Sequence, residues 1–147
     1  YEEPRRRLPG TGGNVDIGAS AKRVISTVPL EHRRFAQQVD FLTTAGYIDG
    51  PGGRNRAGLP PQGPNVCVTT GCVFRFDTSD GGESGSCEMV LDALFPGVSV
   101  GDVIETVPWD LRIADEVKVI APPSDEELSA INRLDADREH RVPGRYS

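Results

Sequence analysis

A segment rich in glycine and proline, Thr43–Pro64, most constrains how this chain of 147 residues can fold. Prolines stand at positions 51, 60, 61 and 64 with glycines between them, so neither a long helix nor a central strand fits there. We therefore expect an irregular loop. Loops of this length are uncommon inside compact domains and are often functional.

Before this loop, the sequence predicts a short helix and two strands. Residues 15–21 follow a cluster of glycines and favour a short helix. Arg23–Val28 is rich in β-branched residues and predicts a strand that Pro29 ends. We expect a second strand over Ala36–Leu42.

After the loop, the sequence predicts a run of short strands. Asn65–Thr70 and Cys72–Asp77 have the composition of strands, and a polar turn follows over Thr78–Ser86. Cys87–Leu94 then predicts the returning strand of a hairpin.

Two helices are expected in the last third of the chain. Ser99 can cap a short helix that ends at Thr106, and Asp102 places a carboxylate near its start. The stretch Pro123–Glu127 predicts a capping box. Three apolar residues then recur at helical spacing and are expected to face a core: Leu128, Ile131 and Leu134. Together these elements predict a single α/β domain, residues 1–147, with a mixed, largely parallel sheet and flanking helices.

Composition and charge limit the partners of the chain. Its 37% hydrophobic and 26% charged residues are typical of a globular protein, and its net charge of −6 argues against a nucleic-acid partner. No apolar run approaches the roughly 18–20 residues of a membrane span. Neither an initiator Met nor a signal-peptide core opens the sequence. We expect a soluble, cytoplasmic chain cut from something longer.

The cysteines and histidines give no sign of a metal site. Cys67, Cys72 and Cys87 are odd in number and lack C-x-x-C spacing, which favours a reduced, intracellular setting over a disulfide framework. His32 and His140 lie far apart without ligand-like spacing, so we expect no metal.

The glycine cluster Gly10-Thr11-Gly12-Gly13 is the first candidate for a binding loop. Glycine permits positive φ, and the absence of Cβ lets a bulky group reach the backbone amides. The cluster matches neither the phosphate-loop nor the dinucleotide-binding pattern. By itself it is equally compatible with a tight structural turn.

The order of motifs along the chain closely resembles the β subunits of glutaconate-type CoA-transferases. The likeness covers most of residues 7–135 and rests on these segments: Gly10–Ile17, Ala21–Ile25, Glu31–Phe35, Val39–Thr43, Gly46–Arg54, Ala57–Pro60, Val68–Asp77 and Phe95–Ser99. The resemblance implies a CoA-transferase-like fold, with this chain as the C-terminal half of the β polypeptide. It also implies two kinds of partner: the N-terminal half of the β polypeptide, and a CoA-transferase α subunit.

The resemblance further implies a mechanism. In this family a glutamate attacks an acyl-CoA and becomes a glutamyl-CoA thioester, and a glycine loop stabilises the oxyanions. That loop matches Gly12 and Gly13, while Gly10, Thr11, Asn14 and Arg54 are expected to contact substrate or CoA. Coenzyme A thioester enters as a substrate, and no permanently bound cofactor is expected. The family's glutamate lies upstream of the loop, so we expect the nucleophile outside this chain.

Several alternatives remain open at this point. Glu31 and Glu105 are better explained as surface residues than as replacement nucleophiles. Arg54 and Arg56 can hold a carboxylate or phosphate, or their loop can pack on a neighbouring subunit. At the level of function, two other readings compete: an acyl-CoA ring-opening hydrolase subunit of steroid breakdown, and a non-catalytic assembly subunit.

Overall fold

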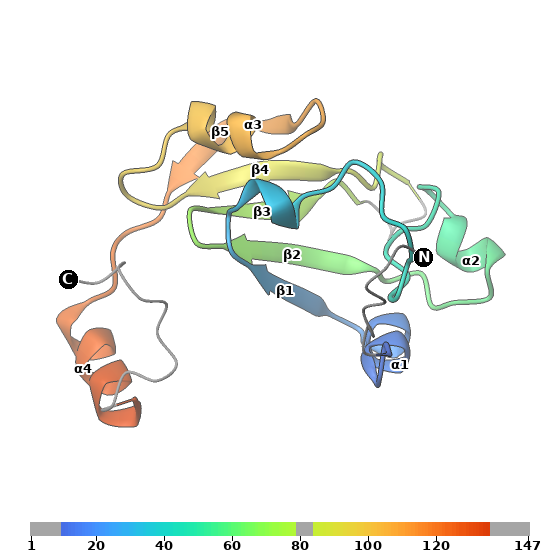
Figure 1. The fold of residues 1–147 in the computed structure, drawn as a ribbon, viewed down its shortest axis with the longest axis horizontal. Coiled ribbons are helices and arrows are strands. Elements are labelled where there is room, and N and C mark those ends of the chain that lie inside the picture. The colour runs from blue at the N-terminus through green and yellow to red at the C-terminus, as the bar shows by residue number, and fades with distance from the viewer. Residues whose placement is uncertain (1–9, 79–83, 136–147) are drawn as a thin grey trace, which may run out of the picture.

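The computed structural model describes residues 10–78 and 84–135. One five-stranded sheet forms its centre, and its strands lie side by side in chain order (Figure 1). The strands are β1 (Val24–Val28), β2 (Pro64–Thr69), β3 (Cys72–Phe76), β4 (Met89–Leu94) and β5 (Arg112–Val119). The helices are α1 (Asn14–Ser20), the 3-10 turn η1 (His32–Arg34), α2 (Gly53–Arg56), α3 (Val100–Thr106) and α4 (Asp125–Leu134).

The sheet is mixed, as expected. β2, β3 and β4 form an antiparallel meander, while β1 and β5 pair in parallel with β2 and β4 at the two edges. Parallel neighbours require a crossover connection, which the segment with η1 and α2 supplies before β2 and α3 supplies before β5. The α/β prediction is confirmed. Two of the four pairings are parallel, so the description of the sheet as largely parallel overstated their share.

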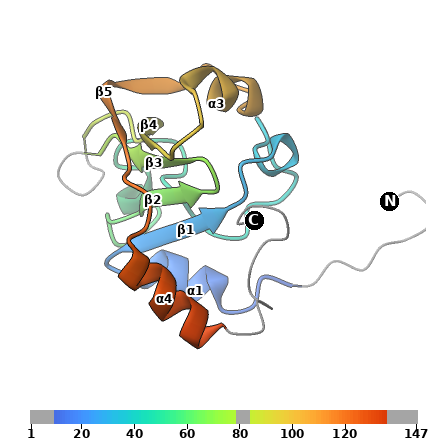
Figure 2. The same ribbon diagram turned by 90° about the vertical axis from the view of Figure 1, so that its left-hand side faces the viewer.

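The main core lies on one face of the sheet. Phe74 and Leu91 are fully buried there, beneath residues of α3 and of the segment after η1. The ring of Phe35 meets that of Phe74 edge-on, with 6.0 Å between centroids, and lies 6.2 Å from Trp109. Figure 2 shows α3 and η1 on the same side of the strands. A smaller apolar cluster lies on the other face: Val66, Val73 and Ala93.

The hairpin between β2 and β3 is fixed by one buried hydroxyl. Thr69 Oγ1 accepts hydrogen bonds from the amides of Gly71 and Cys72, at 3.1 and 2.7 Å, and donates to the Cys72 carbonyl at 2.8 Å. Packing is close at Gly71, where a Cβ would lie 2.7 Å from Cδ2 of Leu30 and the leucine side chain would have to shift.

Most expected elements are confirmed, including the short helix after the glycines, the strand before Pro29 and the β3–β4 hairpin. The predicted capping box of Ser124 with Glu127 is present, and Ser99, expected as an N-cap, forms a second box with Asp102. The polar turn expected over Thr78–Ser86 lies in part outside the described residues.

Two expectations about the elements were wrong, and one strand was missed. Residues 36–42 form no strand: they are exposed, and no strand in the described sheet pairs with them. The apolar side chains of α4 face no core within the described chain, since Leu134 is 88% exposed and no residue of α4 is buried. Finally, β5 was not expected as a strand.

Candidate functional site

The glycine turn leads directly into α1. Gly12 has φ +55°, a left-handed conformation that favours glycine, and Gly13 follows as the N-cap of α1 with φ −71°. The Asn14 amide closes the turn onto the Thr11 carbonyl at 3.4 Å. The five residues from Gly10 to Asn14 are therefore consecutive parts of one compact turn, as the sequence motif predicts.

The turn is open to solvent. Gly10, Gly12 and Gly13 are exposed, and a Cβ built on Gly10 or Gly12 would meet no atom of the described residues within 4 Å. A Cβ on Gly13 would meet only Cδ1 of Ile17, at 3.8 Å. Within the described residues, the amides of Gly12 and Gly13 donate to no protein group. The two backbone N–H groups therefore have no hydrogen-bond partner among the described residues, in a turn whose glycines are exposed.

Among the described residues, the hydrogen bonds of Arg54 all go to residues outside the glycine turn. Its side chain is 2% exposed, and its guanidinium donates to four backbone carbonyls: those of Ala19, Ala45, Gly46 and Pro60. The sequence interpretation of Arg54 as a substrate ligand assumed an accessible side chain. These contacts leave the guanidinium buried in the loop, so we do not include Arg54 among the ligand-binding residues proposed below.

The rest of the long loop is also tightly packed. Tyr47 Oη donates to the Pro64 carbonyl at 2.8 Å, and its ring lies 5.8 Å from that of Phe76. Burial raises the pKa of the Tyr47 hydroxyl. Arg56, in contrast, is exposed and pairs with Asp49 at 2.9 Å. The glycines and prolines of the long loop thus build an ordered segment with no extended regular element.

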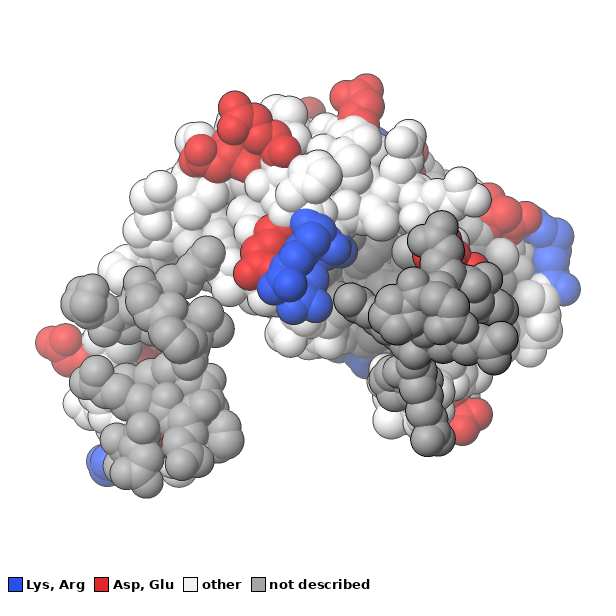
Figure 3. Space-filling model, in the orientation of Figure 1, with Lys and Arg blue, Asp and Glu red and all other residues white. Residues whose placement is uncertain are grey.

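The other charged candidates lie at the surface. Glu31 pairs with Arg33 at 2.8 Å and with Arg34 at 3.7 Å, and Glu105 is exposed on α3. On the face drawn in Figure 3, acidic and basic side chains are dispersed without a continuous basic stripe. These positions agree with the surface roles expected for Glu31 and Glu105.

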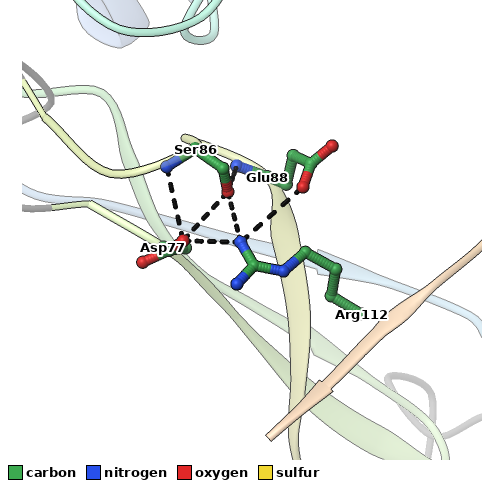
Figure 4. Close-up of polar contacts among 4 residues, drawn as sticks. All are labelled: Asp77, Ser86, Glu88 and Arg112. Atoms are coloured by element: carbon green, nitrogen blue, oxygen red, sulfur yellow. Dashed lines mark hydrogen bonds and ion pairs between the residues drawn. The ribbon is translucent and has the colours of Figure 1, made fainter.

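A second polar cluster, which sequence reasoning missed, joins the β3–β4 hairpin to β5. Arg112 contacts Asp77 and Ser86, and its Nη1 lies 3.6 Å from Glu88 (Figure 4). The hydrogen bond from Arg112, followed by those from Ser86, lowers the pKa of the Asp77 carboxyl. An open groove of about 310 Å³ runs beside this cluster. Both arginines of the groove are engaged in ion pairs, Arg112 with Asp77 and Arg75 with Asp92.

The described residues contain no cluster suited to a metal ion. No three His, Cys, Asp or Glu side chains gather there in an arrangement able to hold one. None of the helices in residues 10–78 and 84–135 combines the length and apolar character that crossing a membrane requires.

No family model matches the chain, but two of its relatives are B subunits of CoA-transferases. The chain is 38% identical over 136 residues to the B subunit of 3-oxoadipate CoA-transferase from Pseudomonas knackmussii, covering 92% of this chain and 50% of that protein. It is 37% identical over 123 residues to the B subunit of glutaconate CoA-transferase from Acidaminococcus fermentans. That match covers 83% of this chain and 44% of that protein.

The fold gives the same result. The crystal structure of glutaconate CoA-transferase from Acidaminococcus fermentans superposes with a TM-score of 0.80 at 33% identity, covering 96% of this chain and 52% of that one. The chain spans about half the length of the relatives that it matches. It is therefore a homologue of CoA-transferase B subunits and corresponds to about half of one such polypeptide.

Proposed function

We propose that this chain is the part of a CoA-transferase B subunit that carries the oxyanion-binding glycine turn. The enzyme moves CoA between carboxylic acids, and its nucleophilic glutamate lies outside this chain. One observation carries the proposal: the open turn at Gly12 and Gly13 presents two amides that pair with no described residue, in a chain homologous to B subunits of such enzymes.

The proposed chemistry gives the turn a defined task. A glutamate carboxylate attacks the thioester carbonyl of acyl-CoA, CoA thiolate leaves, and an acyl–glutamyl anhydride forms. The thiolate then attacks the glutamyl carbonyl of the anhydride, which releases the carboxylic acid and leaves glutamyl-CoA. Each attack develops an oxyanion, and the amides of Gly12 and Gly13 donate to it. Gly10, Thr11 and Asn14 border the same turn and contact the acyl group or CoA.

The surface of the chain supports the need for partner polypeptides, which we propose to be the remaining half of the β polypeptide and the α subunit. Several large apolar residues on and after α1 are exposed here: Val15, Ile17, Ile25, Val39, Phe41 and Leu42. Exposed apolar surface of this kind is characteristic of a protein interface. β1 is moreover an edge strand of the described sheet, and no described strand pairs with its outer side.

The function is tested in the complex that contains this chain, with acetyl-CoA or succinyl-CoA as donor and glutaconate or 3-oxoadipate as acceptor. We expect CoA to appear on the acceptor. Without acceptor, we expect a glutamyl-CoA adduct on another chain that borohydride reduces. Release of free CoA without an acceptor would instead indicate a hydrolase. Absence of both adduct and turnover would favour a non-catalytic assembly role for this chain.

The role of the turn is tested by Gly13→Ala. Residue 13 has an ordinary φ and room for a methyl group, so the variant is expected to fold. Alanine keeps the N–H but adds a methyl group beside it, and we expect this methyl to block the oxyanion. We therefore expect kcat to fall by up to the roughly 10²–10³-fold that loss of one such donor causes. Gly101→Ala is the matched control, because it adds a methyl in ordinary contact on α3, remote from the turn. Equal rates for both variants would contradict the oxyanion role.

A further inference from the structure

Helix α1 depends on the long loop for its position. It has only seven residues, and isolated helices shorter than about 12–15 residues are marginal in water. Thr44 Oγ1 donates to the Asn14 carbonyl at 3.3 Å, at the start of α1. Arg54 Nη2 donates to the Ala19 carbonyl at 2.9 Å, in its last turn. The loop therefore contacts both ends of the helix.

Contact between loop and helix is also close in the middle of α1. A Cβ on Gly18 would lie 2.1 Å from Cγ2 of Thr44, so the loop approaches as near as a glycine allows. Gly18 is correspondingly buried, the one buried residue of α1. Packing and hydrogen bonding thus act on the same short helix.

Arg54 links this helix to the loop through a single rigid group. Nε donates to the Pro60 carbonyl at 2.7 Å, and Nη1 donates to the carbonyls of Ala45 and Gly46, each at 2.9 Å. A buried cation is costly unless its donors are satisfied, and here backbone carbonyls satisfy them. The carbonyls at the end of a helix lack partners within it and carry partial negative charge, which favours a cation at Ala19.

We propose that Arg54 is a positioning residue, which holds α1 and thereby the turn from Gly10 to Asn14 at a fixed place beside the sheet. This inference rests on the proposed function, because it takes the amides of that turn as the groups that need positioning. Arg54 touches neither substrate nor CoA. Its effect is preorganisation: a displacement of about 1 Å at a reacting centre can lower the rate by about 10²-fold.

The test compares Arg54→Ala and Arg54→Lys in the intact complex. An ammonium group has three donors and no planar fork, so lysine cannot reproduce the four contacts. We expect both variants to lower kcat per folded complex by about 10–100-fold with KM for acyl-CoA little changed. Amide exchange across residues 14–20 is expected to accelerate, while exchange in β2 and β3 stays slow. Methylguanidinium added to Arg54→Ala is expected to restore part of kcat.

Asn55→Ala provides the matched control, since Asn55 lies on the same turn of α2 with an exposed side chain. It is expected to leave kcat, KM and α1 exchange unchanged. If Arg54→Ala fails to assemble, Thr44→Ala removes the contact at the other end of α1 and is expected to cause the same changes on a smaller scale.

Three outcomes would overturn the positioning role. The first is a raised KM with kcat retained, which would make Arg54 a substrate ligand. The second is unchanged α1 exchange in a folded Arg54→Ala complex. The third is an Asn55→Ala variant as impaired as Arg54→Ala. An inactive wild-type complex without adduct would contradict the proposed function instead, and the exchange measurement would still report whether Arg54 holds α1.

Discussion

Arg112 Nη1 lies 2.5 Å from Asp77 Oδ2, and this ion pair joins the first residue of β5 to the residue that follows β3. Ser86 donates to the same carboxylate oxygen from both its amide and its hydroxyl. The pair therefore connects an edge strand to the hairpin beside it. β5 pairs only with β4 in the described sheet, so this contact adds a second attachment.

Asp77→Asn is expected to reduce stability in a pH-dependent way. The hydrogen bond from Arg112 lowers the pKa of Asp77 in the folded chain below the value of about 3.9 expected when unfolded. Its contribution to the free energy of unfolding is therefore present above about pH 4 and is lost as the pH falls through the folded pKa. We expect the difference in urea midpoint between wild type and Asp77→Asn to be largest near neutral pH and to shrink in acid.

Glu88→Gln is the control for this prediction, because the Glu88 carboxylate lies farther from Arg112, at 3.6 Å. Its midpoint is expected to change less at neutral pH. If the difference in urea midpoint between wild type and Asp77→Asn stays constant into strong acid, the charge of Asp77 does not cause the difference in stability.

Gly18→Ala is expected to destabilise the chain despite the higher helix propensity of alanine. The new Cβ would clash with Cγ2 of Thr44, and overpacking of this kind costs about 1–3 kcal/mol. Thr44→Ser removes Cγ2 but keeps the hydroxyl that donates to Asn14. In the Thr44→Ser background, Gly18→Ala should become neutral or stabilising, by up to about 1 kcal/mol. Urea unfolding of the wild type and the three variants checks this, and a penalty that persists in the double variant would refute the packing explanation.

Local sequence signals predicted the elements whose stabilising contacts lie within a few residues. The side chains of Ser99 and Asp102 cap each other's amides, and Ser124 and Glu127 do the same. The hairpin residues Thr69 and Cys72 likewise interact across a two-residue connection. Such contacts depend on spacing along the chain, which a sequence displays directly.

Elements that depend on distant partners were not predictable in this way. Residues 36–42 have strand-like composition, yet no edge of the described sheet is paired with them. β5 shows the reverse case. Its sequence is rich in charged residues and does not resemble a strand, yet it pairs with β4 at the edge of the sheet. The contact of Arg54 with α1 was not predictable for the same reason, because its partner Ala19 lies 35 positions away along the chain. The glycine turn was recognisable because all its residues are consecutive.

The three cysteines are expected to react slowly in the folded chain. None of the three forms a disulfide and all are buried, with Cys72 fully enclosed. Burial raises the thiol pKa of Cys72 and of Cys87, which lowers the fraction of reactive thiolate at mildly alkaline pH. A colorimetric disulfide reagent should label the thiols slowly in buffer and rapidly in urea. Fast labelling of any one thiol in buffer would contradict its burial.

Thr69→Val is expected to destabilise the chain more than Thr69→Ser. Valine removes the acceptor for the Gly71 and Cys72 amides and leaves them unpaired in a buried turn. Leaving a buried donor unsatisfied costs about 1–3 kcal/mol, whereas serine keeps the hydroxyl and loses a methyl group worth about 0.8 kcal/mol. Urea unfolding gives the ranking, and amide exchange at residues 71 and 72 gives the location. Equal stability of the two variants, with unchanged exchange at both amides, would mean that the hydroxyl does not hold this hairpin.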